Sequence, residues 1–372
     1  MKNRDKYIAI VFLVFILTIP LVTVVRGFLP EKEVSSEVEQ EILKGNGTLQ
    51  EEADNTAVEA AEESQEVSER DFSFQALQNT LNEFTNRLFL RTKMIAFNTN
   101  LASWLTGGTY IESTQVMAGK DGWLFYKSEL DGHPLWDFMG INHFTEDELA
   151  AIAANLVQTR DYYAERGIDF FVTCIPNKEI IYEEYMPDTT VRVDTVSRAE
   201  QLSTYIKENT DLIYAFPKEA LLDAKKQGLV YYKTDTHWNQ VGAFVGVQEI
   251  FKEAYGNSDS LDKVSFDFTP ESYPGDLAYI AGISDKYPLN DVYSFDTDSA
   301  DKALYHDQVA VVVGDSFGGF LSTVSKGYYK EVYWIKTDAF TMEELESYAP
   351  DVVIWEAVER YCDVFAKPTL RQ

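Results

Sequence analysis

The sequence predicts an α/β fold in which helices cover both faces of a central, mostly parallel sheet. Two runs, at 309–313 and 352–355, are apolar throughout, which is typical of strands buried on both faces of a parallel sheet. A helical pattern over 146–166 begins after Thr145, a suitable N-cap, and leads into a mostly apolar segment at 168–175. Helices that alternate with buried strands indicate a three-layer α/β sandwich.

Shorter segments fit the same architecture. Helical patterns are present at 195–207 and 241–255. A short buried strand is expected at 123–126, after the glycine-bounded turn at 119–122. Apolar residues recur at helical spacing over 77–88 and predict an amphipathic helix that packs on the domain.

Composition excludes some functions and names none. The 372 residues carry a formal net charge of −29, which argues against nucleic acid as a partner because phosphates would be repelled. Two cysteines can form neither a disulfide scaffold nor, alone, a structural zinc site. Cys174 and Cys362 could pair outside the cell, but a cysteine in a buried strand usually behaves as a small apolar residue.

The first 30 residues predict a membrane anchor. Residues 8–25 form an uncharged run that is just long enough to cross a bilayer, and Lys2, Arg4 and Lys6 place the N-terminus inside the cell. A cleaved signal peptide is the alternative, although no clear small-residue cleavage site follows. We therefore expect residues 1–30 to be a cytoplasmic tip and a single-pass transmembrane signal anchor, with everything after them outside the membrane.

Residues 31–70 predict a disordered acidic stalk. They contain 13 acidic and 3 basic residues and no aromatic residue, so they cannot bury enough apolar surface to offset the entropy of ordering. Residues 71–372 are then the folded domain, which carries a net charge of −22 in its own right.

A first candidate site is the sequence Gly314-Asp315-Ser316-Phe317-Gly318, directly after the strand expected at 309–313. The carboxyl ends of parallel strands line the binding crevice of such sheets. A serine in the first turn of the following helix has a free backbone N–H and the positive helix end beside it, and both stabilise an oxyanion. The structural alternative is that Asp315 or Ser316 only caps a helix.

Asp235 and His237 form a second candidate site. A serine nucleophile needs a base, and the base needs a partner that fixes its tautomer. On an extended segment, two residues that are two apart point to the same side, so Asp235 could hold one imidazole nitrogen while the other faces a serine. The alternative is a surface Asp–His pair. One histidine and one aspartate are too few ligands for a metal, so we expect neither metal nor cofactor.

Together, the two motifs resemble the SGNH-like acetyltransferase family of the AlgJ/AlgX type, which is related to the DHHW proteins. The resemblance covers about residues 84–360 and includes four blocks: Gly119-Lys120-Asp121-Gly122-Trp123-Leu124-Phe125, Pro176-Asn177-Lys178, Asp235-Thr236-His237-Trp238 and Gly314-Asp315-Ser316-Phe317. As in that family, the D-x-H pair precedes the serine, which reverses the order of ordinary SGNH esterases. Thr236 stands where DHHW proteins have a second histidine, so the AlgJ/AlgX pattern fits better.

The resemblance implies an SGNH-hydrolase-like sandwich with a catalytic triad. Ser316 would be the nucleophile, His237 the general base and Asp235 the residue that orients it. The backbone N–H of Ser316 would form part of an oxyanion hole. Asn177 is a candidate for the second donor, with a simple turn residue as the alternative.

Four more residues admit both a functional and a structural interpretation. Tyr232 and Trp238 are candidate substrate-binding residues, although strand-face or core packing would explain them equally well. Glu356 and Arg360 follow the last strand. We expect a structural salt bridge between them, or a pair near the cleft.

The resemblance also implies a membrane-anchored, extracytoplasmic O-acetyltransferase that acts on a cell-surface polysaccharide or exopolysaccharide through an acetyl-enzyme. Acetyl-CoA is not expected outside the cell, so a membrane-bound acyl-transferring protein is the implied acetyl donor. The charge of −22 would repel a polyanion such as alginate, so we expect a neutral or amino-sugar-containing glycan. The alternatives are a polysaccharide acetylesterase, which would share the acyl-enzyme, and a non-catalytic glycan-binding or assembly protein.

Overall fold

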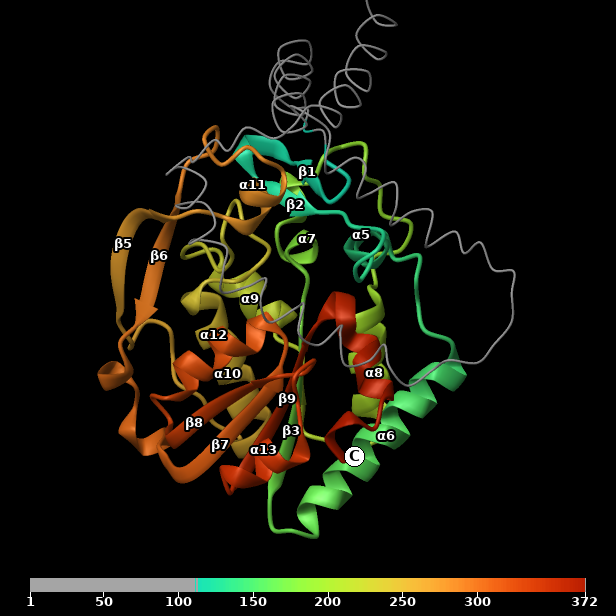
Figure 1. Cartoon of the computed structure of the whole chain (residues 1–372), viewed down its shortest axis with the longest axis vertical. Coiled ribbons are helices and arrows are strands. Elements are labelled where there is room, and N and C mark those ends of the chain that lie inside the picture. Colours follow the sequence, from blue (N-terminus) through green and yellow to red (C-terminus); the bar gives the residue numbers. More distant parts are fainter. Residues whose placement is uncertain (1–110, 112, 372) are drawn as a thin grey trace, which may run out of the picture. The chain divides into compact units, whose positions relative to one another are not determined.

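The computed structural model describes Ile111 and residues 113–371, which are built around one five-stranded sheet (Figure 1). The strand order is β4-β3-β9-β7-β8, and every pairing within this sheet is parallel. The strands are β3 (Asp169–Ile175), β4 (Tyr214–Ala215), β7 (His306–Gly314), β8 (Tyr329–Lys336) and β9 (Val352–Val358). The expected parallel sheet is confirmed, and the last strand of the chain lies at its centre.

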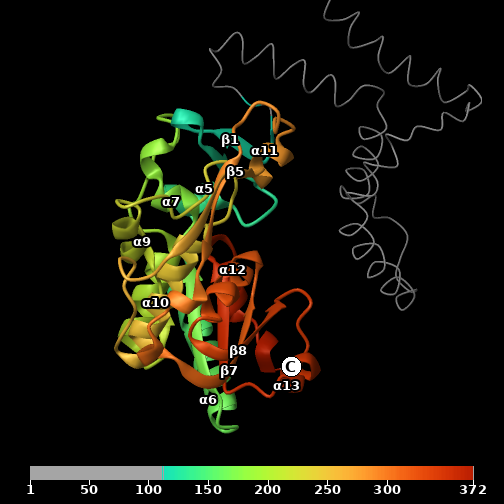
Figure 2. The ribbon, with the colours of Figure 1, turned by 90° about the vertical axis from the view of Figure 1, so that its left-hand side faces the viewer.

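Helices cover both faces of the sheet, which makes three layers. Residues of α9 (Lys218–Ala224), α10 (Gln240–Tyr255) and α12 (Ser316–Ser325) pack on one face, together with Val312 and Ile354. Residues of α6 (Glu146–Ala164), α8 (Arg198–Asn209) and α13 (Met342–Ser347) pack on the other face, together with Val311 and Val353. Figure 2 shows α10 and α13 on opposite sides of β7 and β8. Alternate residues of each central strand are therefore buried in different cores.

The helix boundaries follow from local capping. Thr145 forms a capping box with Glu148 at the start of α6, and Gly167, just beyond its end, has a positive φ of 73°. Asn239 caps α10, because its Oδ1 accepts the N–H groups of Val241 and Gly242. This cap fixes the first turn of α10 directly after the D-x-H segment.

The smaller elements lie at one end of the sheet and along one flank (Figure 1). Two antiparallel pairs are present, β1 (Val116–Ala118) with β2 (Leu124–Tyr126) and β5 (Phe266–Tyr273) with β6 (Asn290–Phe295). Three short helices accompany them: α5 (Pro134–Met139), α7 (Lys178–Ile181) and α11 (Asp276–Ile280). Of these elements, sequence patterning predicts only β2.

The expected anchor (residues 1–30), stalk (31–70) and amphipathic helix (77–88) lie outside the described residues. Among the residues that are described, no helix is both long and apolar enough to span a bilayer. Cys174 and Cys362 are both buried, free thiols.

Candidate active site

The turn between β7 and α12 presents Ser316. Asp315 is the N-cap of α12: its Oδ1 accepts the N–H of Phe317 at 2.8 Å, and its Oδ2 accepts the N–H of Val358 at 2.8 Å. Because Val358 ends the neighbouring central strand, the turn is fixed to the middle of the sheet. Ser316 is exposed, and as the first residue of α12 it has a backbone N–H for which the helix provides no acceptor.

Glu356 lies beneath this turn and accounts for its glycines. A Cβ at Gly314 would overlap the Glu356 carboxyl, and a Cβ at Gly318 would lie 2.9 Å from its Oε2. Burial raises the pKa of Glu356 well above its usual value and so favours the neutral carboxyl. The expected salt bridge with Arg360 is wrong: within the described part of the chain the two form no ion pair, Arg360 Nε has no hydrogen-bond partner, and the Arg360 guanidinium lies 5.5 Å from the Phe317 ring centroid.

The D-x-H segment is a tight loop and not the extended strand that sequence patterning suggests. An antiparallel bridge joins Tyr231 to Trp238, and the N–H of Tyr232 donates to the carbonyl of His237 at 3.1 Å. Within the loop, Asp235 Oδ1 accepts both the backbone N–H and the Nδ1 of His237, at 2.8 and 2.7 Å. The expected contact between the two side chains is therefore made, but by a different backbone geometry.

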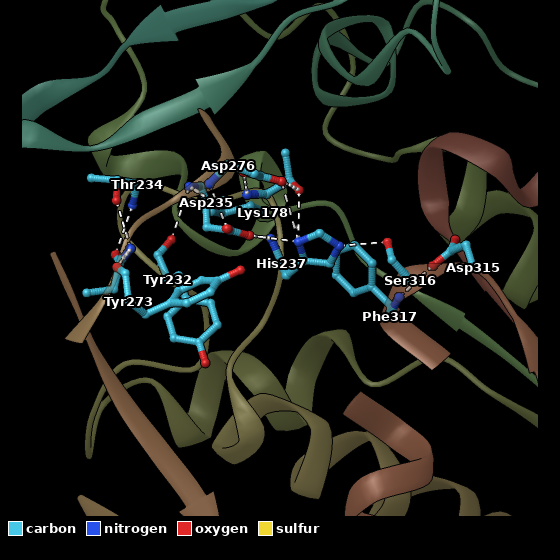
Figure 3. Close-up of polar contacts among 12 residues, drawn as sticks. Lys178, Tyr232, Thr234, Asp235, His237, Tyr273, Asp276, Asp315, Ser316 and Phe317 are labelled. Carbon is cyan, nitrogen blue, oxygen red and sulfur yellow. Dashed lines mark hydrogen bonds and ion pairs between the residues drawn. The ribbon is translucent and has the colours of Figure 1, made fainter. Parts of the chain in front are cut away.

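His237 links Asp235 to Ser316, from which it is separated by 79 residues in the sequence. Its Nε2 lies 2.6 Å from Ser316 Oγ, while its Nδ1 contacts Asp235 (Figure 3). Asp235 is completely buried, and the His237 side chain is 17% exposed. The structure thus brings together the three residues that the sequence motifs single out, in one continuous chain of hydrogen bonds.

Asp276, a residue that no sequence motif marks, is a second carboxylate at His237. Its Oδ2 lies 3.5 Å from His237 Nδ1, and its two oxygens accept the N–H and the hydroxyl of Thr236 at 2.7 and 2.5 Å. Its own N–H donates to Asp235 Oδ2 at 2.8 Å. A Cβ at the preceding Gly275 would overlap the backbone of the D-x-H loop, so only glycine allows α11 to approach this closely.

The two carboxylates control the protonation of the imidazole. Burial alone would lower the pKa of His237, but the hydrogen bonds to Asp235 and Asp276 outweigh it and raise the pKa to about 9. Burial opposes ionisation of Asp276 as well, and the contacts with His237 and Thr236 lower the pKa of this carboxyl nevertheless. The site therefore stabilises the imidazolium, which is the form that His237 adopts after it accepts a proton from a serine.

Asp235, His237 and Asp276 also form the group of potential metal ligands in the described structure, with one ligand atom from each within 4.8 Å of the others. This is one ligand more than the sequence predicts. The atoms that face one another are Nδ1 and the carboxylate oxygens, and Nδ1 is already bonded to Asp235 at 2.7 Å. A cation would compete with the proton in that bond, so we assign the cluster to hydrogen bonding.

Lys178 supports the D-x-H loop from below. Its buried Nζ donates to the backbone carbonyls of Tyr232, Lys233 and Asp235 at 3.1, 3.3 and 2.6 Å. The ammonium also lies 5.4 Å from the ring centroid of Trp123. Burial lowers the pKa of Lys178 to about 8. The Pro-Asn-Lys block thus supplies a cation that fixes the backbone of the segment carrying Asp235.

Asn177 does not reach the cleft as an oxyanion donor. It is completely buried, its Nδ2 donates to Asp137 Oδ2 at 2.8 Å, and its backbone N–H donates to Glu359 Oε2 at 2.8 Å. The expectation from the sequence is therefore corrected: the donors of Asn177 serve two buried carboxyl groups and not an oxyanion at Ser316.

The two candidate substrate-binding residues are buried as well. Trp238 is 0% exposed and packs against Phe317, with 5.7 Å between ring centroids. Tyr232 is 5% exposed and packs beside Tyr273 (Figure 3), with 4.9 Å between ring centroids. The ring centroid of Phe320 lies 6.3 Å from that of Tyr232. Both are packing residues behind the D-x-H loop, so the substrate-binding role expected for them is corrected.

This chain is similar to proteins of a known family. The family described as "SGNH hydrolase-like domain, acetyltransferase AlgX" matches residues 116–359. Among curated relatives, the probable alginate O-acetylase AlgJ of Pseudomonas putida strain KT2440 is 24% identical over 287 residues, which covers 66% of this chain and 70% of the relative. The protein of the same name from Pseudomonas syringae pv. tomato strain DC3000 is 26% identical over 286 residues, or 66% of this chain and 68% of the relative.

Among solved structures, the O-acetyltransferase domain of Pseudomonas putida AlgJ is similar with a TM-score of 0.48 and 20% identity, over 67% of this chain and 92% of that one. A DHHW family protein from Eubacterium siraeum has a TM-score of 0.48 and 13% identity, over 69% and 96% of the two chains. The family match spans most of the described residues, including Asp235, His237 and Ser316. The chain therefore belongs to the SGNH hydrolase-like family of AlgX acetyltransferases and is an O-acetyltransferase of that type.

Proposed function

We propose that this chain is a membrane-anchored, extracytoplasmic enzyme that transfers acetyl groups to a cell-surface polysaccharide through an acetyl-Ser316 intermediate. The observation that carries the proposal is the continuous Asp235–His237–Ser316 hydrogen-bonded chain, with 2.7 and 2.6 Å between successive atoms. Such an arrangement supplies a nucleophile, a base within reach of its proton, and a partner that orients the base.

In the first half-reaction, Ser316 Oγ attacks the carbonyl carbon of the donor's acetyl ester while its proton passes to His237 Nε2. The tetrahedral oxyanion lies at the start of α12, where the backbone N–H of Ser316 and the positive helix end stabilise it. Collapse of this intermediate expels the donor's oxygen, which takes the proton from His237. The product is acetyl-Ser316 with a neutral imidazole.

In the second half-reaction, a hydroxyl of the glycan attacks the acetyl carbonyl and gives its proton to His237. Ser316 then leaves and recovers that proton, so the enzyme is regenerated without a cofactor. Asp235 and Asp276 favour both transition states, because each contains an imidazolium beside their two carboxylates.

The location and the partners follow from the first 70 residues and from charge. Residues 8–25 would hold the chain in the bilayer, and an acyl-transferring membrane protein would supply the acetyl group, because acetyl-CoA is not expected there. The curated relatives are named alginate O-acetylases, so a polysaccharide acceptor is proposed for this chain. The net charge of −22 on residues 71–372 favours a neutral or amino-sugar-containing glycan over polyanionic alginate.

The test uses the full-length chain in detergent. Ser316→Ala should abolish hydrolysis of 4-nitrophenyl acetate. The control is Ser325→Ala, which should turn over normally; Ser325 lies on the same helix, and its hydroxyl donates a hydrogen bond to the Leu321 carbonyl. Equal turnover by both variants would contradict the assignment of Ser316.

Acetylesterase activity remains the second candidate, because Ser316 is exposed and water could reach its acetyl ester. The acetyl content of the envelope glycan in a deletion strain separates the two. Loss of acetyl groups supports a transferase, and an increase supports an esterase.

A further inference from the structure

Two cavities of 590 Å³ each adjoin Ser316 and differ in charge. The first lies beside the last strand, and its lining combines the carboxyl groups of Asp315, Asp338, Glu356 and Asp363 with the ammonium groups of Lys336 and Lys367. The second lies between α12 and the edge strand β8, and its lining includes Lys326 and no acidic residue. The chain carries a net charge of −29. The second cavity therefore differs chemically from the first, because its lining contains no carboxylate although it adjoins the nucleophile.

The second cavity is a groove that follows α12. It is lined from Ser316, the first residue of the helix, to Lys326, the residue after its last turn. Ten residues of α-helix rise about 15 Å, so the groove is long enough for an extended ligand that ends at the nucleophile. Its lining also carries hydroxyl groups: Ser322 and Thr323 both donate to the Gly319 carbonyl, which leaves their oxygens able to accept. We call this cavity the α12–β8 groove.

Trp334 forms the aromatic wall of the α12–β8 groove. It projects from the edge strand and is 36% exposed. Its ring lies against two glycines of α12: a Cβ at Gly318 would be 3.0 Å from the indole Nε1, and a Cβ at Gly319 would be 3.3 Å from the six-membered ring. Gly319 is three residues after Ser316, so these small residues let the indole approach within one helical turn of the nucleophile.

We propose that the α12–β8 groove binds the acceptor glycan as a neutral pyranose chain, with one sugar ring on the Trp334 indole and a neighbouring sugar hydroxyl at Ser316 Oγ. This inference rests on the proposed function and names the substrate site for it. A pyranose presents a face of C–H groups that packs on an aromatic ring, and its hydroxyls need donors and acceptors such as those of Thr323 and Lys326.

Charge argues for a neutral chain. A polyuronate carries one negative charge per sugar, and the groove offers the single ammonium of Lys326 inside a strongly acidic protein. A polycation would be repelled by Lys326 and would find no carboxylate in the groove. A neutral glycan brings no charge of its own into the α12–β8 groove, so no charged group of the ligand is left without a partner there.

Binding can be measured without turnover. In the full-length Ser316→Ala protein, titration calorimetry with cellohexaose, chitohexaose and an oligomannuronate should show binding of the neutral hexamers and weaker or no binding of the uronate. Adding Trp334→Ala should raise the Kd of the neutral hexamers about tenfold, and Trp334→Phe should restore part of the loss. The matched control is Trp136→Ala, a tryptophan on α5 that is 43% exposed and does not line the groove.

Three results would overturn the proposal. Binding of the neutral hexamers that is unchanged by Trp334→Ala would remove the glycan from this groove, and absence of neutral-hexamer binding would remove the ligand class. If Trp334→Ala slows acetylation by the membrane donor but leaves the Kd of the hexamers unchanged, the groove belongs to the donor. The first two results do not depend on turnover, so a failure of Ser316-dependent ester cleavage is recognised separately.

Discussion

Asp276→Asn should move the pH dependence of the enzyme towards acid. In the structure the imidazole of His237 faces two carboxylates, Asp235 at 2.7 Å and Asp276 at 3.5 Å from Nδ1, and its pKa is raised to about 9. The Lys178 ammonium binds the backbone carbonyl of Asp235. Only the neutral imidazole can accept the serine proton, so kcat/KM for a small ester should rise with pH up to about 9 in the wild-type enzyme.

The size of the change follows from the distance. Two unit charges 3.5 Å apart interact by about 1 kcal/mol in bulk water and by about 5 kcal/mol at an effective dielectric constant of 20. One pH unit corresponds to about 1.4 kcal/mol. Since the Asp276 side chain is 31% exposed, water weakens the interaction towards the lower figure. We expect the midpoint of the acid limb to fall by about one to two pH units.

The assay is kcat/KM for 4-nitrophenyl acetate between pH 5 and about 10, the range that brackets the expected midpoint. At pH 7 the neutral fraction of His237 should rise from about 1% to about 10% or more in the variant. The matched control is Asp338→Asn, which removes one negative charge from a cavity at Ser316 without touching His237. NMR titration of the imidazole gives the same midpoint independently of catalysis.

An unchanged acid limb in Asp276→Asn, with a folded protein by circular dichroism, would refute the coupling between Asp276 and His237. An equal shift in Asp338→Asn would show that overall charge, and not the 3.5 Å contact, sets the midpoint.

Three further changes test the supports of the site. Gly275→Ala should lower the free energy of unfolding by about 1–3 kcal/mol in urea titrations, because its Cβ would overlap Thr234, and should weaken the effect of Asp276 on the pH profile. Lys178→Met leaves three backbone carbonyls without their shared donor. It should lower the free energy of unfolding by about 3 kcal/mol and remove most of the esterase activity. Unchanged activity would contradict the role of Lys178 in positioning the D-x-H loop. The stabilisation due to His237, measured against His237→Gln, should be full below about pH 6.5 and vanish as pH rises through about 9, since the folded pKa is the higher one; a difference that is independent of pH would contradict this.

Sequence patterning predicts the parts of the fold that depend on local signals. The apolar runs at 309–313 and 352–355 are inner strands of the sheet, because apolar side chains favour burial on both of its faces. Thr145 and Gly167 mark the ends of a helix for reasons contained within a few residues. The order of the strands cannot be predicted from such local signals. β9 lies between β3 and β7, and this order depends on contacts between segments that are far apart in the sequence.

The site divides in the same way. Ser316, His237 and Asp235 stand in recognisable motifs, and the structure brings their side chains into contact. Asp276 lies 39 residues beyond His237 in an ordinary acidic context, and only the docking of α11 through Gly275 brings it to the imidazole. Trp238 is predicted to bind substrate because it follows His237 in the sequence, but its side chain is buried. The direction of that side chain is set by the tight loop, which sequence adjacency does not predict.

The acetyl-enzyme itself would be the most direct evidence that acetyl transfer passes through Ser316. Full-length protein would be mixed with an excess of acetyl donor, quenched in acid within one turnover, and its peptides analysed by mass spectrometry. We expect one acetyl group on the peptide that contains Ser316, and we expect it to disappear when a neutral glycan acceptor is added before the quench. Two results would contradict transfer through Ser316. One is turnover with the acetyl group on another residue, and the other is turnover that continues in Ser316→Ala.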